Sequence, residues 1–224
     1  MDSQNTAPAP RLALWACVLV MAAVIVVAAV AAAPRSAPRF EGTTYTEVLP
    51  AAEFALTDHD GRPVSLRSYR GAPVLLFFGY THCPDVCPLT LDKLTRALRT
   101  AGRRARDVRI LLVTLDPERD TPAALKTYAA RFGPAVVGLT GDSAGLARAR
   151  QGYGAYSVDV PAQQVPHAHG AHPSAPPPEV AAAMKMVHSG AVYGIDRQGN
   201  LQVVISDAAT LEQVVHDVRI LSRL

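Results

Sequence analysis

The sequence predicts an α/β fold in which a mixed β-sheet is flanked by helices and preceded by one N-terminal transmembrane helix. Three observations predict this fold. Apolar runs of strand length alternate with segments of helical periodicity. Two apolar runs near the C-terminus are joined by a turn signal, which is typical of an antiparallel hairpin. An uncharged apolar stretch near the N-terminus is long enough to cross a membrane.

The N-terminal apolar stretch spans 22 residues, 12–33, without a charged side chain. At about 1.5 Å per residue it is long enough to cross a hydrocarbon core of about 30 Å. The alanines at 31–33 also suit a signal-peptide cleavage site, but Pro34 would follow the cut, so we expect an uncleaved anchor. Cys17 lies inside the stretch and is interpreted as membrane filler. The chain then divides into a short tail (1–11), an anchor (12–33), a tether (34–45) and one folded domain (46–224).

Short apolar runs predict the strands of this domain. A turn signal at Asp60-Gly61 joins two such runs within 54–66 as a hairpin. Continuous apolar runs at 73–79 and 108–115 are typical of strands buried on both faces, so we expect them near the centre of the sheet. The other predicted strands cover 136–140, 191–195 and 201–205, and the last two form a hairpin.

Helical periodicity and capping residues predict the helices. Apolar residues recur three and four positions apart over 88–101. Thr121 is a suitable N-cap for a helix over 122–132, which would begin with proline. Two more helices are expected over 143–151 and 210–221. Strands that alternate with helices, with an antiparallel hairpin at the end, indicate a mixed sheet of the thioredoxin kind.

One segment does not fit a compact core. Residues 161–178 hold six prolines and three histidines and few side chains to bury, so we expect a mobile surface loop. The histidines of this loop are His167, His169 and His172.

The charge balance gives little reason to expect a nucleic-acid partner. Beyond residue 40 there are 19 basic and 18 acidic residues, so the domain is nearly neutral. One basic run follows the second cysteine of the domain, and we interpret it as a solvated helix face, with docking to an acidic partner as the alternative. Its members are Lys93, Arg96, Arg99, Arg103, Arg104 and Arg106.

Cys83 and Cys87 lie where the first buried strand gives way to a helix. Because a helix that began at Cys83 would place Pro88 in its interior, we expect the helix to begin at Pro88. Cys87 would then lie near the N-cap, close to backbone N–H groups that lack helical partners. This environment is expected to favour the thiolate, the form that binds metals and attacks disulfides.

Three interpretations of the cysteine pair are open. The first is a structural disulfide, which would close a very short loop. The second is a redox pair like that of thioredoxin-like proteins, although those use a Cys-x-x-Cys turn one residue shorter. The third is a metal site, which needs a ligand from elsewhere in the chain. His188 is our candidate, because it leads into the final hairpin. Two thiolates and an imidazole suit Cu(I), tolerate Cu(II) and leave zinc open.

The cysteine segment is one of three that resemble known signatures. The three segments are Gly79-Tyr80-Thr81-His82-Cys83-Pro84-Asp85-Val86-Cys87-Pro88, Leu115-Asp116-Pro117-Glu118-Arg119-Asp120-Thr121-Pro122 and His188-Ser189. They resemble the signature segments of the Sco/SenC family of membrane-anchored copper proteins, and they stand in the same order. The resemblance covers about residues 46–224. It implies a thioredoxin fold, with a copper ion held by Cys83, Cys87 and His188. It further implies copper delivery to, or thiol reduction in, the dinuclear copper centre of cytochrome c oxidase subunit II.

The histidine segment departs from the family pattern. Met184 and Val187 stand where the family often has an aromatic and an acidic residue, so the site is expected to be tuned differently. Met184 and Met186 are interpreted as packing residues. Asp116 is expected to orient its turn rather than to bind the metal. The three histidines of 161–178 are either a loose copper-capture site or incidental residues of a polar loop.

Two functional hypotheses follow from these residues. The first is a copper chaperone that is not an enzyme, with thiol:disulfide exchange as an added activity. The second is a thioredoxin-like thiol:disulfide oxidoreductase or peroxidase that uses Cys83 and Cys87 as its redox pair. Only the first needs His188. The expected partners are cytochrome c oxidase subunit II, other periplasmic copper carriers or thiol reductants, and a membrane, without nucleic acid.

Composition and the resemblance together indicate a location, and the resemblance supports the outward orientation of the domain. The chain has 19 Arg and 3 Lys and no Arg-rich amphipathic presequence, which favours a bacterial over a mitochondrial protein. We therefore expect a single-pass protein of the bacterial inner (cytoplasmic) membrane, with its domain on the outer, periplasmic face.

Overall fold

A computed structural model describes residues 10–32, 39–45, 47, 49–155, 157–159, 186–188 and 190–224. Side chains are described in these ranges except at 10–14, 28–32, 157–159 and 186–188. The chain forms two separate units, Met1–Pro38 and Arg39–Leu224.

The first unit contains helix α1, Pro10–Ala32. Its described side chains, over 15–27, are exposed. Over the residues that are described, no helix is both long enough and apolar enough to cross a membrane. The predicted transmembrane helix over 12–33 is therefore not confirmed by the structure.

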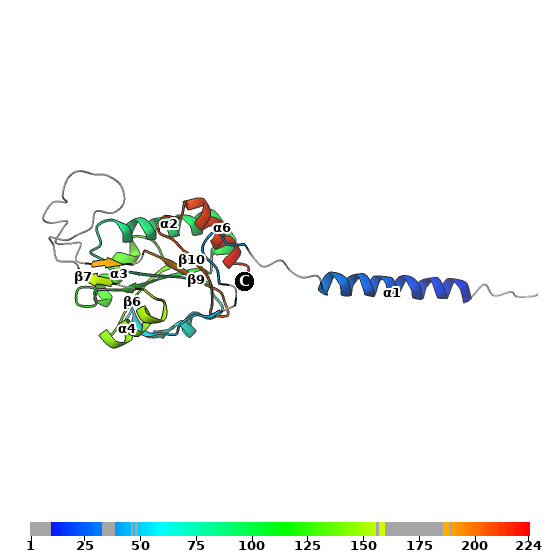
Figure 1. The fold of residues 1–224 in the computed structure, drawn as a ribbon, viewed down its shortest axis with the longest axis horizontal. Coiled ribbons are helices and arrows are strands. Elements are labelled where there is room, and N and C mark those ends of the chain that lie inside the picture. The colour runs from blue at the N-terminus through cyan, green and yellow to red at the C-terminus, as the bar shows by residue number, and fades with distance from the viewer. Residues whose placement is uncertain are drawn as a thin grey trace, which may run out of the picture. The chain divides into compact units, whose positions relative to one another are not determined.

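The second unit is built on a mixed eight-stranded sheet, shown in Figure 1. The central strands β4, β5 and β6 run parallel, and antiparallel strands complete the sheet on both sides. This arrangement confirms the predicted mixed sheet. The strand order is β1 (Leu49–Pro50), β10 (Asn200–Ile205), β9 (Val192–Ile195), β4 (Val74–Gly79), β5 (Arg109–Thr114), β6 (Val136–Thr140), β2 (Ala55–Asp58) and β3 (Pro63–Ser65).

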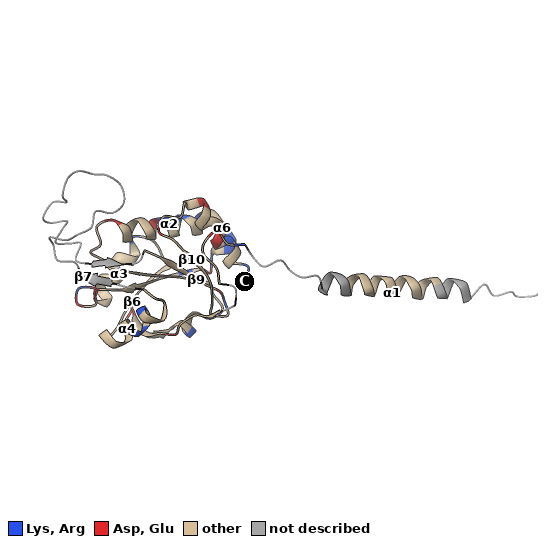
Figure 2. Ribbon diagram, in the orientation of Figure 1, with Lys and Arg blue, Asp and Glu red and all other residues tan. Residues whose placement is uncertain are grey.

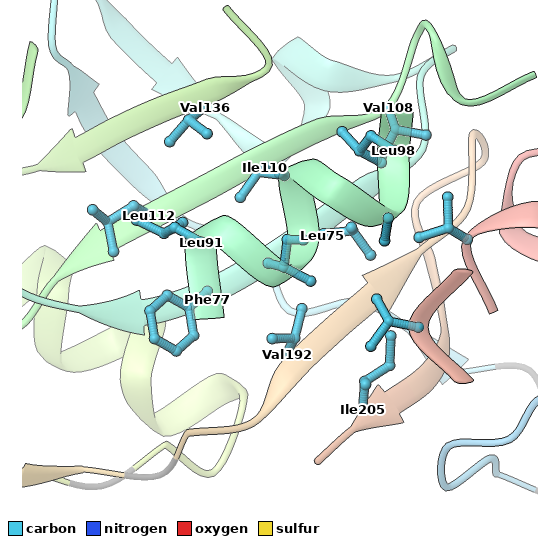
Figure 3. Close-up of a cluster of buried hydrophobic side chains, with 14 of the residues drawn as sticks. Leu75, Phe77, Leu91, Leu98, Val108, Ile110, Leu112, Val136, Val192 and Ile205 are labelled. Carbon is cyan, nitrogen blue, oxygen red and sulfur yellow. The ribbon is translucent and has the colours of Figure 1, made fainter. Parts of the chain in front are cut away.

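Strand β4 is buried along its whole length, as its continuous apolar run predicted. Because successive side chains point to opposite faces, the strand contributes to two cores. Leu75 and Phe77 join the cluster on the side of helices α2 (Val86–Ala101) and α6 (Leu211–Leu221), part of which is drawn in Figure 3. Leu76 and Phe78 join the cluster on the other side of the sheet.

The remaining helices begin where their caps predict. Thr121 accepts a hydrogen bond from the N–H of Ala124 at the start of α3, Pro122–Ala130. Thr210 and Gln213 form a capping box at the start of α6. Helix α4 covers Ser143–Gly152. Two 3₁₀ turns, η1 (Leu66–Tyr69) and η2 (Gly102–Ala105), complete the described helical structure of this unit.

The basic run after the cysteines lies along α2 and η2, and Figure 2 shows Lys and Arg on this helix and on α6. Lys93 has a structural role, since its ammonium group donates hydrogen bonds to the carbonyls of Asp207 and Ala209 at 2.7 Å each. Arg96 faces Asp92 one turn away on the exposed surface. The basic run therefore includes at least one side chain that ties α2 to the segment before α6.

Several parts of the fold differ from the prediction. Strand β1 was not predicted, and α3 ends at Ala130 rather than at residue 132. Helix α2 begins at Val86, not at Pro88, because a proline in the first turn removes only an N–H that lacks a helical partner. A small two-stranded sheet of β7 (Ser157–Asp159) and β8 (Met186–His188) was not predicted, since three-residue strands carry little pattern. The predicted loop over 161–178, with its three histidines, lies outside the described residues.

Candidate metal centre

The fold brings the two domain cysteines together where β4 leads into α2, with Cys83 in the connecting turn and Cys87 in the first turn of the helix. Cys87 is fully buried and Cys83 is 9% exposed. Both are present as thiols, and the backbone N–H of Cys87 points at the sulfur of Cys83 over 3.4 Å. The chain between the strand and the helix thus places both cysteines close together, with Cys87 buried and Cys83 slightly exposed.

Gly79, the last residue of β4, makes room for the inner sulfur. A methyl group on Gly79 would lie 2.9 Å from Sγ of Cys87 and 2.8 Å from the ring of Phe77. Its carbonyl accepts the N–H of Leu115 at 2.8 Å, so the strand end is fixed by β5. The backbone at this point is held in place, and the sulfur packs directly on it.

Replacing Gly79 by Ala is expected to destabilise the domain by about 1 to 3 kcal/mol and to weaken metal binding, because the added methyl group displaces the Cys87 sulfur. Gly138→Ala is the matched control, since a methyl group there meets Cβ of Leu125 at 2.7 Å. Thermal unfolding and metal titration of both variants test the prediction. Equal metal affinity in the two variants would contradict a role for Gly79 in placing the sulfur.

Tyr80 closes the site from the strand side. Its ring is buried, and its hydroxyl is hydrogen-bonded to Cys83. Burial, followed by the charges of Cys83 and Cys87, raises the pKa of the Tyr80 hydroxyl. The hydroxyl therefore stays protonated and able to donate to sulfur.

Cys87 does not have the environment that its place near a helix start predicts. A hydrogen bond with the Cys83 sulfur, together with burial, raises the pKa of the Cys87 thiol above its usual range. A hydrogen bond from the backbone of Tyr80 acts in the opposite direction and does not outweigh them. The predicted preference for thiolate is wrong for the metal-free site, because a second sulfur and an apolar cluster surround this one.

A buried carboxyl group, Asp120, anchors the segment that carries Cys83. It accepts hydrogen bonds from the backbone N–H of Thr81 at 3.1 Å and from the Thr81 hydroxyl at 2.5 Å. The hydroxyl of Thr114, at the end of β5, donates to it at 2.6 Å. Asp120 is fully buried, so these bonds are not shared with solvent. Sequence reasoning did not single out this residue.

Asp116 has a different place in the same turn. Its carboxyl group pairs with the guanidinium of Arg119, and its N–H donates to the Thr114 hydroxyl at 2.9 Å. The contacts of Asp116 thus stay within and next to its own turn, whereas Asp120 binds Thr81 of the cysteine segment.

His188, the predicted third ligand, lies in β8 opposite Ser157 of β7. Its side chain is outside the described part of the structure, so its role as a ligand stays a prediction. Met184 is also outside the described residues, and only the backbone of Met186 is described. Among described side chains, no group of three or more His, Cys, Asp and Glu residues is arranged to hold a metal. His82 contacts the Thr81 hydroxyl at 3.0 Å and is half exposed.

Comparison with known proteins identifies the family. The SCO1/SenC family model matches residues 43–223. The chain belongs to the SCO1/SenC family. Among curated SCO relatives, the mitochondrial SCO2 homologue of Bos taurus is 36% identical over 169 residues, which cover 75% of this chain and 58% of that protein. The chain spans less than two thirds of the length of the curated relatives that it matches.

Two solved Sco structures are similar to this SCO1/SenC protein. The structure of Bradyrhizobium japonicum ScoI with copper bound has a TM-score of 0.61 and 34% identity, over 77% of this chain and 99% of that one. It supports the predicted thioredoxin-like α/β fold. BsSco has a TM-score of 0.54 and 23% identity, over 82% of this chain and 97% of that one, and shares the fold. It is described as having a disulfide switch and as a member of the Sco family of cytochrome c oxidase assembly proteins.

Proposed function

We propose that this SCO1/SenC protein binds a copper ion through Cys83, Cys87 and His188 and passes it on during the assembly of cytochrome c oxidase. The observation that carries the proposal is the pair of buried sulfurs presented by one turn. The copper-bound state of ScoI, which has the same fold, supports copper as the ion. The expected recipient is the dinuclear copper centre of subunit II.

The donor set fits copper on chemical grounds. Two sulfurs in a largely apolar site are soft ligands, which favour Cu(I). The raised pKa of the Cys87 thiol means that a bound cation must displace a proton that this thiol holds firmly. An imidazole from β8 would complete a three-coordinate site. The ion is cargo in this proposal, and the protein's own contribution is to hold the sulfurs close together and away from water.

One observation also favours thiol:disulfide exchange. The thiols of Cys83 and Cys87 are hydrogen-bonded to each other, so they are near enough to be candidates for a disulfide. In exchange with a disulfide of subunit II, the pair would be oxidised to a disulfide while the partner is reduced to two thiols, and the copper ion would lose both thiolate ligands. Under this second function, the pair would keep the thiols of subunit II reduced and would need no imidazole.

Replacing His188 by Ala separates the two functions. We expect the full chain, purified without oxygen, to bind one copper ion tightly, and the variant to lose affinity by about 100-fold because a ligand is removed. His216→Ala is the control, since this exposed histidine lies on α6 and contacts the carbonyl of Arg39. Copper stoichiometry and competition with a Cu(I) chelator measure the effect. Unchanged copper binding in His188→Ala would exclude this histidine as a ligand.

We further propose that segment 12–33 attaches the protein to a bacterial inner membrane, with the domain on the periplasmic face. The uncharged sequence and the exposed apolar side chains of α1, among them Trp15 and Leu19, support the attachment. The full chain is expected to stay in the membrane pellet at alkaline pH, and a chain that lacks residues 1–38 is expected to be released. Release of the full chain under the same conditions would contradict the attachment.

A further inference from the structure

Four arginines line one pocket on the surface of the domain. Arg103 and Arg104 come from η2, which follows α2, whereas Arg219 lies in the last turn of α6 and Arg223 just after it. The other lining residue is Ala101, at the end of α2. All four arginines are exposed. The basic run noted in the sequence therefore meets a second group of positive charges from a distant part of the chain.

Acidic side chains do not balance this pocket within the part of the chain that the structure describes. None of the ion pairs there includes one of the four arginines. Arg219 donates to a neutral acceptor, the carbonyl of Thr100, at 3.3 Å. Asp107, which follows η2, pairs with Arg197 at 3.8 Å instead. Asp217 of α6 is buried and accepts hydrogen bonds from two backbone N–H groups.

The ends of two helices offset only part of this positive charge. The pocket lies at the C-terminal ends of α2 and α6, and each such end carries about half a negative elementary charge. Together they offset about one of the four positive charges. Like charges gathered in one pocket repel one another, and a bound anion relieves this repulsion. Guanidinium groups bind phosphate through paired N–H donors, so the pocket suits phosphate groups.

The place of the pocket favours the phosphates of a membrane surface over a free ion. His216, Arg219 and Arg223 are spaced three and four residues apart, so they lie along one side of α6 and the turn after it. His216 contacts the carbonyl of Arg39 at 3.0 Å, so the chain enters the domain beside this side of the helix. Only residues 34–38 separate Arg39 from the proposed membrane segment, and five residues span at most about 18 Å.

We propose that the pocket formed by Arg103, Arg104, Arg219 and Arg223 binds the phosphate groups of anionic lipids and so holds the domain against the membrane surface. The inference rests on one part of the proposed function, the membrane attachment, and does not depend on copper. The attachment limits how far the domain can move from the membrane, and the pocket sets which side of the domain faces it. Because the contact is electrostatic and exposed, it weakens as the salt concentration rises.

Chemical modification of arginine tests this proposal on the full chain. The protein is reconstituted in vesicles of phosphatidylcholine alone, or of equal parts of phosphatidylcholine and phosphatidylglycerol, and treated with phenylglyoxal. Peptide mass spectrometry should show that anionic vesicles slow the modification of the four pocket arginines by at least about fivefold, and that high salt removes this protection. Arg62 is the internal control, because its exposed side chain lies in the turn between β2 and β3 and should react equally in both vesicles.

The double variant Arg104→Gln/Arg223→Gln removes half of the charge. Neither side chain forms a hydrogen bond or an ion pair among the described residues, so thermal unfolding should be unchanged. The two remaining arginines of the pocket should lose their protection in anionic vesicles, since each arginine removed weakens the contact by about fivefold. The matched control is Arg62→Gln/Arg67→Gln, which also removes two exposed arginines and should keep the protection.

Equal modification rates of the pocket arginines in the two kinds of vesicle overturn the proposal, and so does protection that the pocket variant retains. Protection by inorganic phosphate in neutral vesicles, without protection by anionic lipid, overturns the lipid as the source of the phosphate. A full chain that neutral vesicles release at alkaline pH, but whose pocket arginines anionic vesicles protect, overturns the attachment through segment 12–33 and supports the pocket.

Discussion

Replacing Cys87 by Ser is expected to lower Cu(I) affinity by about two to four orders of magnitude. A hydroxyl is a hard ligand and a poor acid, so it does not replace a thiolate on a soft ion. If the proposed set of Cys83, Cys87 and His188 holds the ion, this variant removes one of its three ligands. Metal binding by such a set is strong, as the apparent binding free energy of about 10 to 16 kcal/mol for structural zinc in zinc-finger peptides illustrates. The loss should greatly exceed that of any partner residue around the sulfurs.

The measurement is competition with a Cu(I) chelator on protein purified without oxygen. Cys17→Ser is the matched control, because this third cysteine lies in α1 and outside the domain unit. It should leave the affinity unchanged. Thermal unfolding of the Cys87→Ser variant without metal shows whether the variant is folded. A large folding defect is not expected, because Ser is close to Cys in size. A Cys87→Ser protein that is folded and still binds copper with wild-type affinity would show that the ion is held elsewhere.

Replacing Asp120 by Ala is expected to destabilise the domain by about 3 to 5 kcal/mol and to release the cysteine segment from the end of β5. The carboxyl group accepts from the backbone and hydroxyl of Thr81 and from the hydroxyl of Thr114. Hydrogen bonds to a charged group contribute about 1.5 to 3 kcal/mol each, and the deletion leaves buried donors without an acceptor. The effects of neighbouring bonds do not add fully, so the expected total is less than their sum.

Chemical denaturation of Asp120→Ala measures the first effect, and copper affinity measures the second. Asp92→Ala is the control, because Asp92 is exposed and its one ion pair among the described residues is with Arg96, one turn away. Such surface pairs contribute about 0.5 kcal/mol or less. If the two alanine variants lose similar amounts of stability, the buried network around Asp120 does not hold the segment in place.

The sequence predicted the central strands well because their signals are local. Strand β6 has the predicted bounds, and β4 was recognised by its unbroken apolar run. The start of α2 was placed two residues late, because the effect of Pro88 depends on which turn of the helix contains it. The sequence shows the proline but not the residue at which the helix begins.

The site was harder to predict because it depends on contacts between distant segments. Asp116 and Asp120 stand in one turn, and only the fold decides which of them reaches Thr81. The proton affinity of Cys87 was predicted in the wrong direction, since its burial and its neighbour Cys83 come from the tertiary structure.

If the protein passes on a copper ion as proposed, the unequal exposure of Cys83 (9%) and Cys87 (0%) would set an order for the exchange with a partner. A ligand that approaches from solvent meets Cys83 first, whereas Cys87 is closed off by the strand end at Gly79. Transfer of an ion would then proceed stepwise, through an intermediate shared between the incoming ligand and the inner sulfur, and the inner bond would break last. Such a sequence keeps the ion coordinated throughout, so that it is never released into the surrounding water.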